Sequence, residues 1–479
     1  MLFPTIDFAI FFGVVFVGNW LLVPHPTAWK VFILLASYVF YAWADWHDVL
    51  VLMGSTSLTY AGGRLVEAAR SPTARRRWLA ATVTAELGLL ASFKYYGLFS
   101  LTVDNAAVRL GVHGAPVPLV VQAVFPIGIS FYTFMGLSYV IDVYRGSLRS
   151  APPLDVAVYA SFFPHLLAGP IVRGEELLPQ IARCAQRDQR HLDLTEAAFL
   201  IVGGLFKKVV LSSYVSSAIV TPVFSAPSVH SAPEILLAAY GYSVQIYCDF
   251  SGYTDIAIGC AMLLGFQFPQ NFDAPYAARS LQEFWRRWNM TLSFWLRDYL
   301  YIPLGGNREG RSALYRNIMV TMVLGGLWHG AGWTFVAWGA LHGIGQCIGH
   351  ANRWRRARAG RSPQRDGIAQ VWLERLATFS FVSLAWLFFD SSSIGGAVTL
   401  VTRLVTTWGQ PAPLVRLPVV AVVVFALSLQ LVPSAVGMRA RELFVGLGTV
   451  TKGLVLGLAL AVITTLGPAG IAPYIYFRF

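Results

Sequence analysis

The chain has 479 residues, of which 56% are hydrophobic and 13% are charged, and its formal net charge is +12. Because soluble domains carry about 25% charged residues, this deficit excludes an ordinary soluble protein and indicates a polytopic membrane protein. The basic residues lie in short loops without a stripe of base-stacking aromatic residues, so no nucleic-acid partner is expected. The four cysteines form no Cys-x-x-Cys pair, so neither a disulfide framework nor a zinc site is expected.

Apolar runs long enough to cross a bilayer begin near the N-terminus and recur along the chain. A transmembrane helix needs about 20 apolar residues. The first run contains an acidic residue and no basic segment precedes it, which favours a retained span over a cleavable signal peptide. The runs predict an all-α fold of roughly eleven or twelve transmembrane helices, in one membrane domain that fills the chain (1–479). The candidate runs are 5–22, 28–44, 48–63, 78–98, 117–142, 193–218, 234–266, 317–350, 370–390, 416–435 and 453–472.

Two stretches depart from the pattern of simple spans. The run 154–172 is broken by Pro164, Gly169 and Pro170, which predicts a re-entrant segment. The run 317–350 is long enough for a helical hairpin.

The distribution of lysine and arginine predicts the orientation of the chain. All the strongly basic loops fall on one side if both termini lie outside, and that side is then the cytoplasm. One of these loops contains an amphipathic region that is expected to lie on the cytoplasmic surface. The basic loops are 64–78, 183–190, 279–316 and 353–365.

The stretch "LGGLWHGAGWTF" (324–335) places one imidazole, His329, among glycines and tryptophans. Twelve residues of helix after Asn317 put it about 18 Å into an apolar layer that is about 30 Å thick. A buried polar ring costs free energy unless it is hydrogen-bonded, so an ionisable group at that depth is a functional candidate. The structural alternative is a histidine bonded to a carbonyl of a neighbouring helix.

Several sequence blocks together carry a resemblance that none of them would carry alone. The core stretch 245–350 contains "QIYCDFSGYTD", "FWRRWNMTLSFW" and "GGLWHGAGWTFVAWGALHG". Further blocks are "FPIGISFYTFMGLSYVIDVYRG", "FFPHLLAGPIVR", "GLFKKVV" and the chain end "YIYFRF". This set closely resembles the membrane-bound O-acyltransferase (MBOAT) family, in its bacterial alginate O-acetyltransferase branch.

The resemblance implies that His329 and Asn289 are the catalytic residues. A buried neutral imidazole suits a base that takes a hydroxyl proton, and an amide N–H suits the tetrahedral oxyanion. The glycines beside His329 are expected to leave room for a substrate. Relatives in this branch usually carry histidine where this chain has Asn289; since asparagine cannot titrate, a mechanism with two histidines is in question.

Other polar residues are candidates for the donor site or for a tunnel. The arginines suit coenzyme A phosphates or an acidic carrier protein, although lipid headgroups explain them nearly as well. The acidic residue has an alternative role in fixing the core helices, and His342 is expected to be a packing residue. Lys207 and Lys208 are expected to reach for the membrane interface. The candidates are Arg286, Arg287, Arg297, Trp328, Asp249 and His165.

The resemblance implies a multi-pass O-acyltransferase of the bacterial cytoplasmic (inner) membrane. It would move an acyl group, most readily acetyl, from a cytoplasmic acetyl-CoA or acyl-carrier thioester, for O-acetylation of a cell-surface polysaccharide. An extracytoplasmic SGNH-type acetyltransferase is the implied partner, and neither a bound cofactor nor a metal is expected. The alternatives are D-alanyl transfer from a carrier protein to teichoic acid, and a glycan or lipid-linked sugar transporter without chemistry of its own. The transporter should carry paired inverted repeats, and the sequence has none.

The chain ends in the aromatic tail "PYIYFRF" (473–479), which the charge bias places on the outer side. Such a tail is ordinarily an interfacial anchor. The alternative is that Tyr476 accepts the acyl group and passes it to the partner, so that no bulky glycan has to reach His329.

Overall fold

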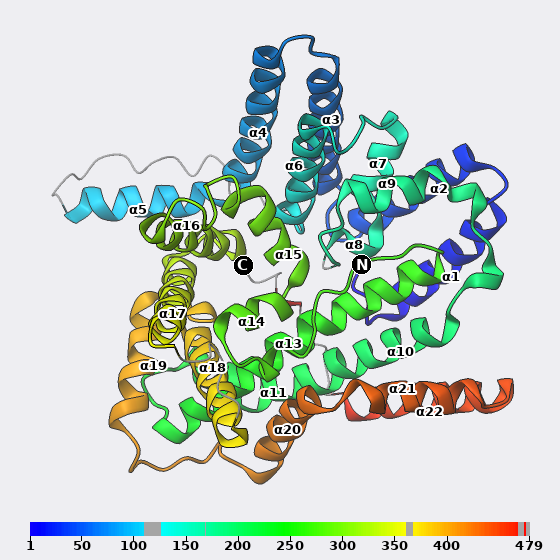
Figure 1. Ribbon diagram of the computed structural model, residues 1–479. Helices are drawn as coiled ribbons and strands as arrows, with labels where there is room; N and C mark the ends of the chain where they lie inside the picture. The colour runs from blue at the N-terminus through cyan, green and yellow to red at the C-terminus, as the bar shows by residue number, and fades with distance from the viewer. Residues whose placement is uncertain (110–125, 168, 361–366, 468–473, 476–479) are drawn as a thin grey trace. The chain divides into compact units, whose positions relative to one another are not determined.

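Every regular element of the described residues is a helix, as the sequence predicts (Figure 1). The computed structural model describes residues 1–109, 126–167, 169–360, 367–467 and 474–475. The predicted tail residue Tyr476 therefore lies outside the described residues.

The Cα positions divide the chain into two compact units. Unit 1 comprises Met1–Ala197 and Ala257–Pro269, and unit 2 comprises Ala198–Ile256 and Gln270–Phe479. Compact units describe packing rather than function, so the single membrane domain stays a prediction.

Unit 1 is built on the packing of α3, α4 and α6, of which α6 is buried along nearly its whole length. A Cβ atom on Gly136 of α6 would lie 2.3 Å from Thr59 Oγ1, so only glycine permits this approach. The hydroxyls of Ser55 and Thr59 donate to the buried Glu86 carboxylate, which satisfies its oxygens between the helices. The helices are α1 (Ile6–Leu21), α2 (Pro26–Ala42), α3 (His47–Ala68), α4 (Pro72–Lys94), α5 (Tyr96–Arg109), α6 (Ile129–Arg145), α7 (Pro153–Ser161), α8 (Phe163–Leu166), α9 (Gly174–Ala182), η1 (Cys184–Gln186) and η2 (Gln189–His191).

The segment predicted to be re-entrant is broken into α7 and α8. The break falls at Phe162, and Pro164 stands in the first turn of α8, where its missing N–H costs nothing. A helix of nine residues spans only about 14 Å, so α7 is too short to cross a bilayer.

Unit 2 holds most of the remaining helices, while α10 and α13 run across the boundary between the units. They are α10 (Leu194–Leu205), η3 (Phe206–Ser212), α11 (Ser213–Val215), η4 (Ser216–Val220), α12 (Thr221–Ser225), α13 (Ala232–Leu263), η5 (Pro275–Ala277), α14 (Leu281–Arg287), α15 (Met290–Leu296), η6 (Arg297–Tyr301), α16 (Arg311–His329), α17 (Trp333–Arg358), α18 (Ile368–Phe389), α19 (Ile394–Thr406), α20 (Leu417–Ser428), η7 (Leu429–Leu431), α21 (Ser434–Val445) and α22 (Thr449–Leu466).

The predicted hairpin of 317–350 is confirmed as α16 and α17, which pack along each other (Figure 1). The turn between them is only three residues long, from 330 to 332. At the opposite end, the guanidinium groups of Arg311 and Arg358 both contact the Trp354 ring, with their Cζ atoms 3.2 and 3.6 Å from its centroid. The start of α16 and the end of α17 therefore lie beside each other. A hairpin with both ends on the same side of a membrane requires this arrangement.

The predicted amphipathic region is two short helices, α14 and α15, followed by the π-helical η6. Asn289 interrupts the helical backbone between α14 and α15, because its own backbone is left-handed, with φ 41° and ψ 58°. Asparagine tolerates this conformation better than most residues.

By length and composition, two of the described helices could cross a membrane, α18 and α22. A third span results if the bent pair Leu417–Leu431 and Ala435–Val445 counts as one. The eleven or twelve predicted spans are therefore not confirmed. Many predicted runs form helices that are short, as α1 and α2 are, or interrupted, as the path from α10 to α12 is by two π-helical segments.

Candidate active site

His329 is the last residue of α16 and is buried, with 3% of its surface exposed. Three aromatic rings surround its imidazole. The centroid distances are 4.9 Å to Trp328, 5.2 Å to Trp338 and 5.2 Å to Phe389. Trp338 and Phe389 both stand nearly edge-to-face to the imidazole, at 89° and 70°. The rings fix the orientation of the imidazole in an apolar environment.

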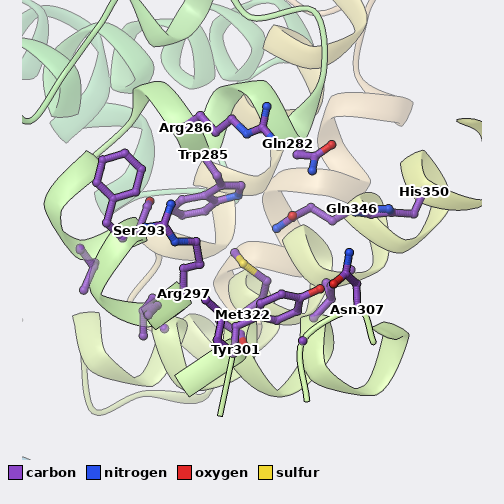
Figure 2. A pocket seen from close by; sticks show the side chains of 18 of the residues that line it. Gln282, Trp285, Arg286, Ser293, Arg297, Tyr301, Asn307, Met322, Gln346 and His350 are labelled. Carbon is purple, nitrogen blue, oxygen red and sulfur yellow. The ribbon is translucent and has the colours of Figure 1, made fainter. Parts of the chain in front are cut away.

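A cavity of about 700 Å³ in unit 2 reaches His329. Helices α14, α15, η6, α16 and α17 and the turn after η6 contribute its wall (Figure 2). The wall joins the buried His329 to three exposed arginines, Arg286, Arg297 and Arg308. The same cavity is therefore lined by exposed, positively charged groups and by a buried imidazole.

Other polar side chains that donate and accept hydrogen bonds line the same cavity. Burial raises the pKa of the Tyr301 phenol, so this group stays protonated and can donate. These groups match a long ligand that carries both amides and phosphates better than a purely apolar chain. The polar wall residues, apart from the arginines and His329, are Gln282, Ser293, Tyr301, Asn307, Thr321, Gln346 and His350.

His342 packs beneath the cavity wall, as expected, and is fully buried. The Trp285 indole N–H donates to His342 Nδ1 at 3.2 Å, and Trp285 itself lines the cavity. The Trp338 ring lies 4.8 Å from the His342 ring. His342 therefore supports two of the aromatic residues that shape the cavity.

Asn289 is buried, with 1% of its surface exposed, and is the N-cap residue directly before α15. Its side-chain Nδ2 has no hydrogen-bond partner among the described residues. The preceding loop holds the start of α15, because Asn271 accepts from the Met290 and Thr291 backbone N–H groups. Asn289 is not among the residues that line the cavity, although Ser293 in the next turn of α15 is. Its catalytic role stays a prediction.

The prediction that the glycines beside His329 leave room for a substrate is wrong for two of them. A Cβ on Gly326 would lie 2.3 Å from Phe335 O, and one on Gly330 would lie 2.1 Å from the Phe335 ring. These glycines admit α17 rather than a ligand. Gly325 does line the cavity.

Of the six candidates for a donor site or tunnel, Arg286 and Arg297 line this cavity and the other four do not. The Arg287 guanidinium pairs with Glu283 at 2.9 Å, and Trp328 packs against His329. His165 lies in unit 1, buried against the Phe162 and Phe268 rings.

The fourth of these, Asp249, forms a buried ion pair with Lys208. The expectation that Lys208 reaches for the membrane interface is therefore wrong, because its side chain is fully enclosed by protein. Lys207 pairs with Asp255 in the same way, with 20% of its side chain exposed.

The sequence prediction missed Gln346 and His350 on the cavity wall. They follow His342 at intervals of four residues, so all three lie on one face of α17. This spacing of polar residues in an apolar run was the signal that could have found them.

Comparisons with known proteins identify the family of this chain. The profile described as "MBOAT, membrane-bound O-acyltransferase family" matches residues 113–389, which is more than half of the chain. A protein of Pseudomonas putida named "Probable alginate O-acetylase AlgI" is 34% identical over the full length of both chains. Its namesake in Pseudomonas syringae is 38% identical over 82% of this chain and 73% of its own. A peptidoglycan O-acetyltransferase of Helicobacter pylori is 33% identical over 84% of this chain and 79% of its own.

Proposed function

Because this chain belongs to the membrane-bound O-acyltransferase family and is a membrane O-acyltransferase, we propose that it takes an acetyl group from a cytoplasmic thioester for O-acetylation of a cell-surface polysaccharide. The family makes it an enzyme and a membrane protein, which sets aside the transporter alternative. The following observations support the donor and the acceptor, while the multi-pass topology rests on the apolar runs and the charge bias of the sequence.

One observation carries the proposal: the cavity joins exposed arginines to the buried His329. Arginine binds phosphate through paired charge-assisted hydrogen bonds, so Arg286, Arg297 and Arg308 suit the phosphates of coenzyme A. The amide side chains of Gln282 and Gln346 line the same cavity and suit the amides of the pantetheine arm of coenzyme A.

The reaction at His329 is then an acyl transfer. The acceptor hydroxyl oxygen attacks the thioester carbonyl, and His329 takes the hydroxyl proton as the new C–O bond forms. The carbon–sulfur bond of the tetrahedral intermediate breaks, and the thiolate leaves with the proton that His329 returns. The products are an ester on the acceptor and a free thiol. The Asn289 amide is proposed to donate to the oxyanion of the intermediate.

The acceptor side of the proposal draws on the named relatives, which act on alginate and on peptidoglycan. Both are polysaccharides that lie outside the cytoplasmic membrane. An SGNH-type acetyltransferase would complete the transfer on the outer side, with Tyr476 as the acyl relay. The variant Tyr476→Phe separates a relay from an anchor, because it keeps the ring and removes the oxygen that would accept the acyl group.

Mass spectrometry of surface polysaccharide, from cells with and without this protein, tests the proposal. The expected result is that ester-linked acetyl groups disappear when the protein is absent and return with the wild-type gene. If ester-linked D-alanine disappears instead, the acyl group and donor have been misassigned and the D-alanyl alternative holds. If the surface esters are unchanged, the acceptor is not a surface polysaccharide.

A further inference from the structure

Two lysines and two aspartates form paired contacts between η3 and α13 in unit 2. Lys208 pairs with Asp249, with side-chain exposures of 0% and 3%, and Lys207 pairs with Asp255, with 20% and 26%. Lys207 also donates to Ser251 at 3.0 Å. The two pairs use the same chemistry on the same two helices, but only the first is fully buried.

Two facing glycines explain how the charged groups come into direct contact. A Cβ on Gly204 would lie 2.6 Å from Gly252 O, and a Cβ on Gly252 would lie 2.7 Å from Gly204 O. The helices therefore touch backbone to backbone directly beside the buried pair. The π-helical segment η3 begins two residues after Gly204. Segments of this kind often mark functional sites.

The buried aspartate has a second contact, with the far end of the chain. The Ile475 backbone N–H donates to Asp249 Oδ2 at 2.7 Å, across 226 residues of sequence. The neighbouring Tyr474 ring lies 4.3 Å from the Tyr253 ring and 6.2 Å from the Phe250 ring. Tyr474 and Ile475 are both buried, so this part of the tail is enclosed by unit 2.

Burying an ion pair is costly, and apolar residues of similar volume are often as stable in its place. The Asp249 carboxylate directs one oxygen to Lys208 and accepts a hydrogen bond from the Ile475 backbone N–H with the other. An apolar pair could not accept this hydrogen bond. The backbone N–H of Ile475 would otherwise be a buried donor without a partner. The contact therefore fixes the register of the tail against α13, since a shift by one residue would misplace both Ile475 and Tyr474.

We propose that the Lys208–Asp249 pair is the docking site of the chain's own C-terminal segment and that Asp249 is a positioning residue for acyl transfer. The positioning role rests on the proposed function, because Tyr476 follows the docked residues by one position. Lys208 holds the carboxylate, the carboxylate holds the Ile475 N–H, and the aromatic rings of Tyr253 and Phe250 hold Tyr474. Docking therefore fixes the residues that directly precede Tyr476, the proposed acceptor, in the sequence.

The test uses the full-length protein in detergent and in cells. The double variant Lys208→Met/Asp249→Leu removes both charges together, so neither is left buried alone. The matched control is Lys207→Met/Asp255→Leu, which removes the neighbouring pair. Ile475→Pro is a second probe, because it removes only the N–H donor and leaves the buried pair intact. Hydrogen exchange of the C-terminal peptide, thioester cleavage with its KM for acetyl-CoA, surface acylation and the melting temperature are measured for each.

The expected result is that Lys208→Met/Asp249→Leu and Ile475→Pro speed exchange of the C-terminal peptide at least tenfold, while the control leaves it unchanged. Surface acylation and thioester cleavage should both fall at least tenfold in the first two variants, because the acyl group then has no positioned acceptor, while the KM for acetyl-CoA and the melting temperature stay close to those of wild type. A merely structural role would also lower the melting temperature or raise the KM and would contradict positioning.

Unchanged exchange in Ile475→Pro would overturn the docking site. Faster exchange with normal surface acylation would overturn the positioning role. Neither outcome touches the proposed function, which depends on His329 and on loss of the surface ester when the whole protein is absent.

Discussion

His329 and Trp338 meet across the α16–α17 hairpin with their ring centroids 5.2 Å apart and their planes at 89°. Both residues line the same cavity, and both are buried. An edge-to-face contact of this kind is worth about 0.5–1.5 kcal/mol beyond the buried area, and it favours one orientation of the imidazole. The proposed base is therefore held by the packing of two helices rather than by a loop.

Close packing of the hairpin predicts that Gly326→Ala destabilises the protein. The new Cβ would lie 2.3 Å from Phe335 O, so α17 has to move. Overpacking of this kind costs about 1–3 kcal/mol. Thermal unfolding in detergent measures the effect, with Gly349→Ala on α17 as the control, because a Cβ there meets its nearest atom at 4.0 Å. An equal melting temperature for Gly326→Ala and wild type would show that the hairpin tolerates separation.

The proposed role of the cavity arginines in donor binding predicts an effect for Arg286→Ala and Arg297→Ala. Each should raise the KM for acetyl-CoA by about ten- to a hundredfold with kcat nearly unchanged, because a hydrogen bond to a charged group is worth about 1.5–3 kcal/mol. Steady-state kinetics in proteoliposomes measures this. Arg287→Ala is the matched control, since Arg287 does not line the cavity; it pairs with Glu283 much as Arg297 pairs with Asp298. If all three variants behave alike, the arginines serve the lipid surface instead.

The predicted role of Asn289 is positioning and oxyanion stabilisation rather than proton transfer. Asn289→Ala should lose most of the activity, while Asn289→His should retain a measurable part, as a mechanism with a histidine there would allow. Asn289→Gly separates the side chain from the backbone, because glycine adopts the observed positive φ without strain. Activity of Asn289→Gly near that of wild type would mean that the position matters for the turn alone.

The charge bias predicts that the loop 279–316 faces the cytoplasm. Asn307→Cys, in a background with Cys347→Ala, should react with an impermeant maleimide only after spheroplasts are opened. Asn307 is exposed, whereas Gly306 is buried with φ 58°, so Asn307 is the better position. Trp46→Cys should react in intact spheroplasts, because the predicted topology places it between two predicted spans on the opposite side. The reverse pattern of labelling would invert the topology and the direction of the donor.

The sequence predicted the parts of the site that depend on local chemistry. The hairpin around His329 followed from the length of its apolar run, and residue type, spacing and family resemblance pointed to His329 and to two of the arginines that line the cavity with it. The left-handed turn at Asn289 was not predicted, because one asparagine in a helical pattern carries no such signal.

Long-range packing accounts for most of what the sequence did not predict. The contact of Asp249 with Ile475 joins residues 226 positions apart, and a local pattern cannot reveal which carboxylate lies beside which backbone group. Lys208 looked like an interfacial lysine because its partner was not evident from the sequence. The number of spans stays a prediction, since hydropathy counts apolar runs and cannot tell a crossing helix from a buried or broken one.

Activity of His329→Ala tests the central claim most directly. The purified variant, beside wild type and the surface control His191→Ala, is assayed for transfer of acetyl from acetyl-CoA and for thermal unfolding in detergent. The account predicts that transfer falls by about a hundredfold or more, because loss of a general base costs about 10²–10⁴-fold, while the melting temperature stays close to that of wild type. A well-folded His329→Ala protein that keeps more than about a tenth of the wild-type rate would contradict the assignment of His329 as the base.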